Sequence, residues 1–153
     1  RTKFFIMITC LLNLISLLFV MDQPAFSQNL EASTITVNIT NVRNKEGTIR
    51  LCVFKDQASF STEQASKIMH LAKNELSGGK MTTSVELPSG TYGIAVLDDE
   101  NSNDKMDYAL MMPKEGFGFS NFYLTGLSRP KFEQFKFLVG DANFSVVIRM
   151  KYM

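Results

Sequence analysis

The sequence predicts an all-β domain, and three observations support that prediction. Apolar and polar residues alternate with a period of two over several separate stretches. Glycine, proline, asparagine and aspartate residues, which favour turns, separate these stretches. The chain has no regular succession of strand-like and helix-like segments, which argues against a parallel β/α fold. The expected architecture is therefore an antiparallel sandwich of about seven strands in two sheets, with one short helix and one long loop.

The beginning of the chain has the pattern of an export signal. Arg1 and Lys3 form a short positive head, and residues 4–21 are almost wholly apolar. The small residues Ala25 and Ser27 then stand just before the expected cleavage point. This order of a positive head, an apolar middle and a small-residue exit predicts export of the protein.

The export signal sets the domain boundaries and the location. We divide the chain into a signal peptide, residues 1–27, and a single β-sandwich domain, residues 28–153. The mature protein is then periplasmic or secreted, and we expect it to meet a membrane only through the signal peptide during export. The alternative is an uncleaved anchor helix, because a run of about 18 apolar residues is just long enough to span a bilayer.

Charge and cysteine content narrow the function classes. Basic and acidic residues are equal in number once residues 1–27 are removed. This balance argues against a nucleic-acid-binding protein, which needs a basic surface. Cys52 is then the one remaining cysteine, so no intramolecular disulfide can form. Because Cys52 stands in an apolar strand pattern, we expect a buried thiol that serves packing.

The first half of the domain contains a predicted hairpin and a predicted helix. Residues 35–39 and 49–53 alternate, and the polar stretch 41–47 between them is typical of a turn. The second strand is apolar on both faces, so we expect it to be the more deeply buried. Residues 61–64, with the sequence STEQ, match a capping box and predict a short helix. A weak strand is expected within residues 69–76.

The second half supplies the remaining strands. Residues 81–87 alternate, and residues 92–97 are apolar on both faces, as in a central strand. Gly93 within this strand leaves room on one face for a bulky neighbour. Residues 135–139 and 144–152 alternate again and complete a sandwich of the immunoglobulin or prealbumin type.

Residues 98–129 show no sustained periodicity and are predicted to form a long loop. Loops of about 30 residues in a compact domain are usually functional or disordered. The aromatic residues of this loop need burial or a ligand, which argues against disorder. The candidate functional residues of the chain therefore come from this loop.

An acidic, asparagine-rich stretch opens the loop and predicts a calcium site. Calcium prefers about six to eight oxygen ligands, which alternate residues of a curved loop can supply. The sixth position is Asp104, where the calcium-binding helix–loop–helix motif needs glycine, so the alternative is a turn whose side chains cap their own backbone. The candidate metal ligands are the side chains of Asp99, Asn101, Asn103 and Asp107 and the backbone carbonyl of Lys105.

A glycine- and aromatic-rich stretch follows at residues 113–121. Its glycines let the backbone turn while the rings pack together. One interpretation is an aromatic platform for a ligand such as a sugar, and the other is a loop that covers the open end of the sandwich. The candidate platform residues are Phe117, Phe119, Phe122 and Tyr123.

Catalysis is the weaker interpretation of the sequence. His70 is the only histidine, no nucleophile motif accompanies it, and we expect it at an exposed or edge-strand position. A hydrolase that acts through the acidic loop is a third hypothesis, although a carboxylate pair needs two different environments. The favoured hypothesis is a non-enzymatic exported module, with calcium as the candidate cofactor and an unknown protein or glycan as the partner. The second hypothesis is a carbohydrate-binding or adhesive domain that uses the aromatic residues of the loop.

Several runs of the sequence carry a resemblance to a known family. They are GTYGIAVLDDEN at residues 90–101, PKEGFGFSN at residues 113–121, and a pattern that begins at Pro130. The chain resembles a family of exported bacterial proteins known as domain of unknown function number 2141. The resemblance implies an exported β-sandwich and assigns no activity. In that family the acidic loop typically begins with histidine, where this chain has Asp98.

Overall fold

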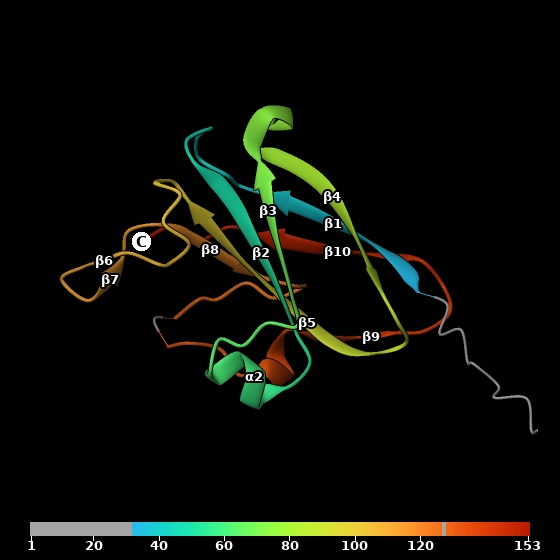
Figure 1. Ribbon diagram of the computed structural model, residues 1–153. Coiled ribbons are helices and arrows are strands. Elements are labelled where there is room, and N and C mark those ends of the chain that lie inside the picture. Colours follow the sequence, from blue (N-terminus) through green and yellow to red (C-terminus); the bar gives the residue numbers. More distant parts are fainter. Residues whose placement is uncertain (1–31, 127) are drawn as a thin grey trace, which may run out of the picture.

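Two facing sheets and one small hairpin make up the computed structural model, which describes residues 32–126 and 128–153 (Figure 1). The predicted export signal lies outside the described residues. The three-stranded sheet has the order β10-β1-β4, and its strands are β1 (Ser33–Thr40), β4 (Lys80–Leu87) and β10 (Phe144–Arg149). The all-β prediction is confirmed.

The larger sheet has five strands, in the order β3-β2-β5-β8 with β9 also paired to β5. β8 pairs with the second half of β5 and β9 pairs with its first half, so both lie along the same edge. The strands are β2 (Thr48–Phe54), β3 (Lys67–Ala72), β5 (Gly90–Asp99), β8 (Gly116–Phe119) and β9 (Lys136–Val139).

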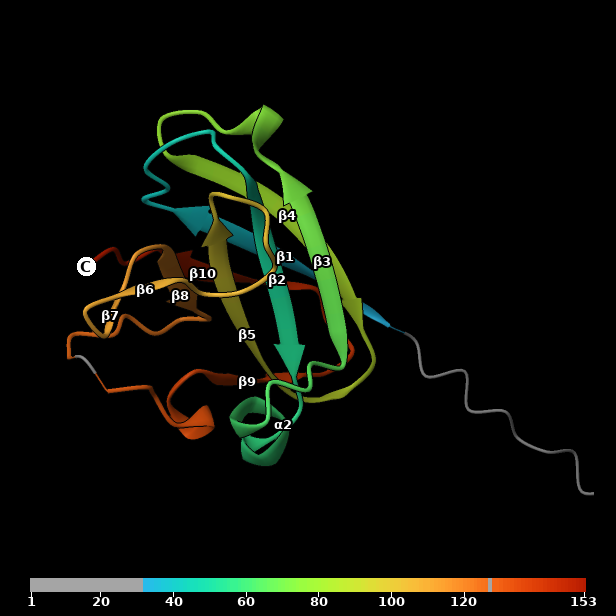
Figure 2. The same cartoon turned by 60° about the vertical axis from the view of Figure 1, so that its left-hand side comes forward.

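Three short helices and a hairpin complete the fold. They are α2 (Gln57–Ser61), the 3-10 helices η1 (Lys73–Glu75) and η2 (Phe132–Gln134), and the hairpin of β6 (Tyr108–Ala109) with β7 (Met112–Pro113). Figure 2 shows α2 and η2 below one end of the larger sheet and the β6–β7 hairpin on the side of β8. The described chain therefore has ten strands rather than about seven, two of which are only two residues long. None of the described helices has the length and apolar character needed to cross a membrane.

The core lies between the two sheets and follows the period of two. Ile35, Val37 and Ile39 of β1 are completely buried, while the residues between them are partly exposed. Leu51 of β2 and Ile94 of β5 face them from the other sheet and are also completely buried. The alternation that predicted these strands therefore identified the core face of each one.

The predicted hairpin of residues 35–39 and 49–53 is wrong. β1 pairs with β4 and β10, whereas β2 pairs with β3 and β5 in the other sheet. The intervening turn, in which Asn41 and Gly47 adopt positive φ, carries the chain across the core instead of folding it back. The pairing of β1 with β10 is moreover parallel, so the sandwich is not wholly antiparallel.

The short helix exists, but not where the sequence placed it. α2 begins after Asp56, whose carboxylate accepts a hydrogen bond of 2.7 Å from the backbone N–H of Ser59. The reciprocal bond from the Asp56 N–H to the Ser59 hydroxyl completes a capping box that begins five residues earlier than the predicted one at Ser61. Glu63 has a positive φ of 58°, which ends the helix, and Lys67–Ala72 forms the edge strand β3.

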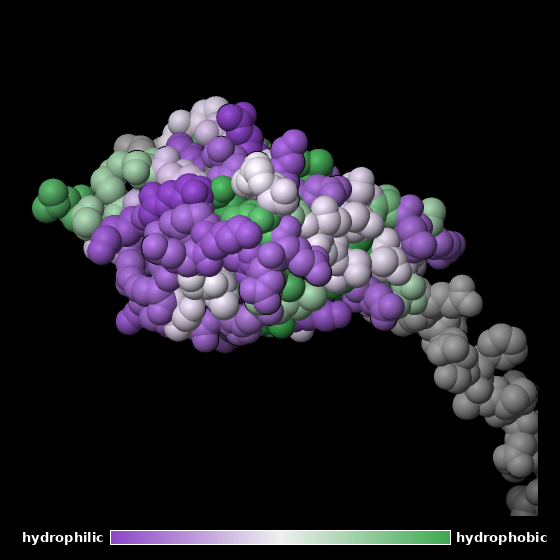
Figure 3. Space-filling view, turned by 90° about the horizontal axis from the view of Figure 1, so that it is seen from above, coloured by the Kyte–Doolittle hydropathy of each residue, from purple (hydrophilic) through white to green (hydrophobic). Residues whose placement is uncertain are grey.

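The long loop is more regular than its sequence indicates. Within residues 98–129 the chain forms β6, β7 and the edge strand β8. Gly116 and Gly118 lie on the inner face of β8, where a side chain would have no room. Tyr152 occupies the space beside Gly116, and Ile148 occupies the space beside Gly118. Seen from above, a hydrophobic projection stands on the left, the side on which Figure 1 shows the β6–β7 hairpin (Figure 3).

Candidate functional site

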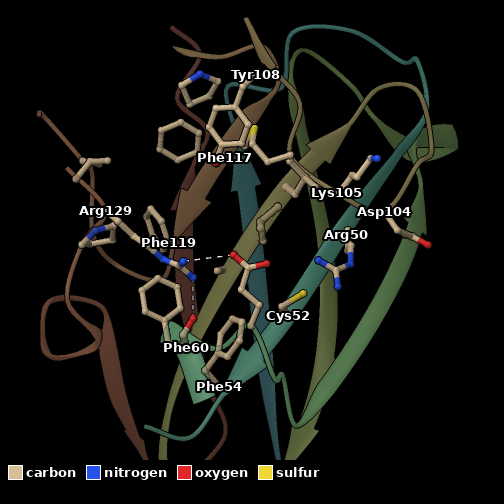
Figure 4. Close-up of a pocket in the computed structure, with 18 of the residues that line it drawn as sticks. Arg50, Cys52, Phe54, Phe60, Asp104, Lys105, Tyr108, Phe117, Phe119 and Arg129 are labelled. Carbon is tan, nitrogen blue, oxygen red and sulfur yellow. Dashed lines mark hydrogen bonds and ion pairs between the residues drawn. The ribbon is translucent and has the colours of Figure 1, made fainter. Parts of the chain in front are cut away.

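A pocket lies on the outer face of the five-stranded sheet, away from the core. Leu51 and Val53 of β2 enter the core, and strand alternation therefore turns Arg50, Cys52 and Phe54 to the opposite face (Figure 4). This second apolar face explains why β2 is hydrophobic on both sides. Arg50 is a charged residue within this otherwise apolar strand, and the sequence-based prediction did not recognise it as a candidate site residue.

β5 and β8 continue the floor of this pocket. Ala95 pairs with Phe119 and Leu97 pairs with Phe117, so the two rings stand beside small or aliphatic neighbours on one face. The inward-facing glycines of β8 bring this strand close to the core, and its two phenylalanines consequently face out over the sheet. The floor is therefore broad and apolar.

A cluster of phenylalanines closes one end of the pocket. The ring of Phe60 from α2 lies 5.3 Å from that of Phe54 and 4.9 Å from that of Phe135, both edge to face. Phe119 lies 5.1 Å from Phe135, and Phe132 of η2 packs against the same ring. Each edge-to-face pair adds about 0.5–1.5 kcal/mol beyond area burial, so these contacts stabilise the wall.

The pocket has a volume of about 460 Å³. Its rim comes from the turn after α2, the acidic loop, the β6–β7 hairpin, the segment before η2, and Met153 beyond β10. Ligand pockets of about 300–1,000 Å³ with apolar walls and few polar groups are typical of small-molecule sites. The rim residues are Glu63, Asp104, Lys105, Met106, Tyr108, Met111, Pro113, Leu124, Arg129, Pro130 and Met153.

The charged groups at the pocket divide into paired and unpaired ones. Arg129 forms an ion pair of 3.3 Å with Glu63, donates 2.7 Å to the Phe60 carbonyl, and lies 4.3 Å above the Phe60 ring. His70 of β3 lies 2.6 Å from the carboxylate of Asp104. Arg50 has no ion pair within the described part of the chain, although it stands beside the apolar floor.

The thiol of Cys52 belongs to the floor of the pocket and is buried, as predicted. Burial raises the pKa of this thiol above its ordinary value. A thiol with a raised pKa remains protonated at neutral pH and is a poor nucleophile. Cys52 therefore contributes an apolar surface rather than a reactive group.

The acidic loop folds around the carboxylate of Asp99. This buried carboxylate accepts hydrogen bonds from the backbone N–H groups of Asn103, at 3.0 Å, and Asp104, at 2.7 Å. The N–H of Lys105 in turn donates 3.0 Å to the side-chain oxygen of Asn103. These are the contacts of a turn whose side chains bind their own backbone.

Two of the other predicted metal ligands, Asn101 and Asn103, converge on Asp107. Its Oδ2 atom accepts 2.6 Å from the side-chain amide of Asn101 and 3.1 Å from that of Asn103. The buried Glu115 accepts the backbone N–H groups of Asp107 and Glu100 and so ties both ends of the loop together. Within residues 32–126 and 128–153, no three His, Cys, Asp or Glu side chains are grouped to hold a metal ion.

Asp98, at the start of the acidic stretch, points the other way and enters the core. Its Oδ1 atom pairs with the ammonium group of Lys73, and its Oδ2 atom accepts a 2.5 Å hydrogen bond from the Tyr152 hydroxyl. Asp98 and Lys73 are almost fully buried, and Tyr152 is partly buried. Asp98 therefore anchors the loop to the sandwich and is unavailable to a ligand of the loop.

The four candidate platform aromatics occupy two places. Phe117 and Phe119 line the pocket on the larger sheet. Phe122 and Tyr123 instead lie in a shallow depression with residues of β10, where the Arg149 guanidinium is 4.7 Å from the Tyr123 ring centre. Phe122 also packs against the phenylalanine cluster that contains Phe119, with which it forms a β-bridge. The structure therefore brings three of the four aromatics together and leaves Tyr123 beside Arg149.

The fold and the pocket define a small β-sandwich domain with a ligand-sized cavity on the outer face of one sheet. Residues 37–147 match the family described as uncharacterized proteins conserved in bacteria, DUF2141. The chain belongs to this family, as its resemblance indicated. No curated protein and no solved structure matches the chain.

Proposed function

We propose that the protein is an exported, non-enzymatic module that binds a small apolar ligand with a negatively charged group. The observation that carries this proposal is the placement of Arg50, a cation without a carboxylate partner among the described residues, beside the apolar floor of a cavity of about 460 Å³. An unpaired guanidinium at a partly desolvated site favours binding of an anion.

The balance of charge at the pocket supports an anionic ligand. Its basic side chains are Arg50, Lys105 and Arg129, and its acidic ones are Glu63 and Asp104. Glu63 and Arg129 already pair with each other, and the Asp104 carboxylate lies 2.6 Å from the ring of His70. Arg50 and Lys105 have no carboxylate partner among the described residues, so an anionic group entering the pocket meets these two cations.

A binding role also agrees with the chemistry of the groups at the floor. The raised pKa of Cys52 disfavours its use as a nucleophile. The floor otherwise consists of alkyl and phenyl groups, which supply binding energy but no proton transfer.

Two fluorescent probes test the proposal. We expect anilinonaphthalene sulfonate, which is aromatic and anionic, to bind and to brighten, and phenylnaphthylamine to report the apolar floor without a charge. Arg50→Gln is expected to weaken the anionic probe about tenfold and leave the neutral probe unchanged, which corresponds to one charge-assisted hydrogen bond.

A matched control and a blocking variant complete this test. Arg149→Gln, which changes an arginine of the other sheet, should leave both probes unaffected. Ala95→Leu fills the floor and should weaken both probes. Equal binding of both probes by the Arg50 and Ala95 variants and by the unaltered protein would refute the pocket as the binding site.

Calcium is a second candidate ligand, and the convergence of Asn101, Asn103 and Asp107 favours it. Rotation of the two amide groups would turn their oxygens toward the Asp107 carboxylate, and one cation would then have to offset the hydrogen bonds that these oxygens accept from the N–H groups of Asn103 and Lys105. Calcium bound to the native state must raise the melting temperature, and a chelator must lower it. An unchanged melting temperature in millimolar calcium, or a shift retained by Asp107→Asn, would rule this ligand out.

A further inference from the structure

Arg50 and His70 occupy paired positions on neighbouring strands of the larger sheet. Arg50 of β2 lies opposite His70 of β3 in the antiparallel register. Met69 and Leu71 pack against the core, so strand alternation turns His70 to the outer face of the sheet, where Arg50 also lies. Directly opposed residues of such a pair have Cβ atoms about 4.5–5.5 Å apart. The histidine therefore stands beside the unpaired arginine of the pocket.

Asp104 connects this histidine to the rim of the pocket. Its Oδ1 atom lies 2.6 Å from Nε2 of His70, and Asp104 lines the pocket on the side of Arg50 (Figure 4). The backbone N–H of Asp104 donates 2.7 Å to the buried carboxylate of Asp99, which holds this part of the loop in place. Of the six carboxylates in residues 98–115, only Asp104 lines the pocket. Its charge is therefore the one in this loop that most directly opposes an anion.

The elements packed against β3 bring a small set of charges to His70. The lysines at the two ends of the strand have partners elsewhere, because Lys67 donates to the Glu86 carbonyl and Lys73 pairs with Asp98 in the core. The charged residues that β2 and the acidic loop place on the side of His70 are Arg50, Asp99, Asp104 and Lys105.

We propose that His70 makes the affinity of the pocket for anions depend on pH. Histidine side chains gain a proton between about pH 8 and pH 5. Neutral His70 leaves the Asp104 charge uncompensated near Arg50, whereas protonated His70 pairs with that charge. Anions should consequently bind more tightly at the lower pH. The inference rests on the proposed function and adds a means of regulation to the same pocket.

Asp104 also explains how a second cation is tolerated beside Arg50. Like charges directly opposite each other in a sheet are destabilising. The Asp104 carboxylate offsets this repulsion because it contacts the protonated ring of His70. The side chains of His70 and Asp104 are 49% and 62% exposed, so solvent screens their charges. The expected change in anion affinity is therefore only about threefold.

Probe binding at two pH values provides the test. The affinity for anilinonaphthalene sulfonate, whose sulfonate stays ionised throughout, should be about threefold higher at about pH 5.5 than at about pH 8. Phenylnaphthylamine carries no charge at either pH, so its affinity should not change. His70 is the only histidine of the chain, and His70→Gln should remove the pH dependence of sulfonate binding.

Two further variants separate the effect of charge from a structural effect. Asp104→Asn removes the opposing charge and should raise the sulfonate affinity at about pH 8, a gain that damage to the pocket would not produce. Lys67→Gln changes an exposed cation of the same strand and should retain the pH dependence. Because His70, Asp104 and Lys67 are all exposed, thermal melting at both pH values should show each variant folded.

Thermodynamic linkage gives an independent readout. Since protonated His70 favours the bound anion, the bound anion must favour protonated His70 by the same factor. The His70 ring should therefore hold its proton to a higher pH when anilinonaphthalene sulfonate is bound. Proton NMR follows this titration through the single histidine of the chain. Phenylnaphthylamine should leave the titration unchanged.

Equal sulfonate affinity at both pH values would overturn the inference and leave the pocket proposal intact. A pH dependence that His70→Gln retains would also overturn it, because another group would then be responsible. Absence of sulfonate binding at both pH values would instead refute the pocket proposal and, with it, the role of His70. The two failures are therefore distinguishable.

Discussion

The ring of Phe135 occupies the space directly over Gly93. A Cβ atom added to Gly93 would stand 2.5 Å from Cε2 of Phe135 and 2.9 Å from the ring of Phe132. The room that Gly93 was predicted to leave for a bulky neighbour is therefore filled by the aromatic wall of the pocket. This confirms a specific expectation drawn from a single glycine in a central strand.

Gly93→Ala should lower the free energy of unfolding by about 2 kcal/mol, because the new methyl group overpacks the phenylalanine cluster. Urea denaturation measures this loss. Gly140→Ala is the control, because no atom lies within 4 Å of its added methyl group. Equal stability of the two variants would show that the cluster yields without cost.

Lys73 and Asp98 should behave as one buried unit. Lys73→Met alone leaves a buried carboxylate without its cation, since Oδ1 of Asp98 has no other polar partner among the described residues. The expected loss of stability is about 3–5 kcal/mol. Replacing both residues, with Lys73→Met and Asp98→Leu, should recover most of it. Additive losses in this double-mutant cycle would contradict the coupling.

Tyr152 predicts a loss of stability in alkali. Burial, together with its hydrogen bond to Asp98, raises the pKa of this hydroxyl above its ordinary value of 10.0. The folded state therefore holds a proton that the unfolded state releases, and stability falls as the pH rises above about 10. Tyr152→Phe should remove this part of the pH dependence. Parallel stability curves for the two proteins between neutral and alkaline pH would refute the assignment.

Cys52 predicts slow chemical modification of the native protein. Because burial raises the pKa of the thiol, the thiolate fraction at pH 8 is lower than in the unfolded chain. We expect iodoacetamide to react at least about tenfold faster in urea than in buffer, followed by intact mass of the mature chain. Equal rates in the two solvents would mean that the pocket floor is open to the reagent.

The periodicity of the sequence was sufficient to predict the class of fold and the core face of most strands. It was insufficient to predict strand partners, because Ile35 and Ile49 have the same alternation whether their strands share a sheet or face each other. The helix was misplaced because Ser61–Gln64 and Asp56–Ser59 both offer capping side chains, and only the packing of Phe60 against Phe54 selects the second.

The candidate site was only partly predictable for a related reason. The acidic loop is local, so the residues that meet at Asp107 could be found from their spacing. The pocket is assembled from strands far apart in the chain, and its walls depend on sheet order. Arg50 was missed because an arginine in a strand of mixed pattern looks like any exposed residue until the second apolar face is known.

The parallel pairing of β1 with β10 has a consequence for the order of folding. β1 can pair with β4 early, but its other edge is completed only by β10, so the smaller sheet stays incomplete until residues 144–149 have been made. If the protein is exported as proposed, its chain would be unable to close this sheet while it passes through a translocon from the N-terminus. Truncation just before Phe144 should accordingly leave a product that proteases digest rapidly.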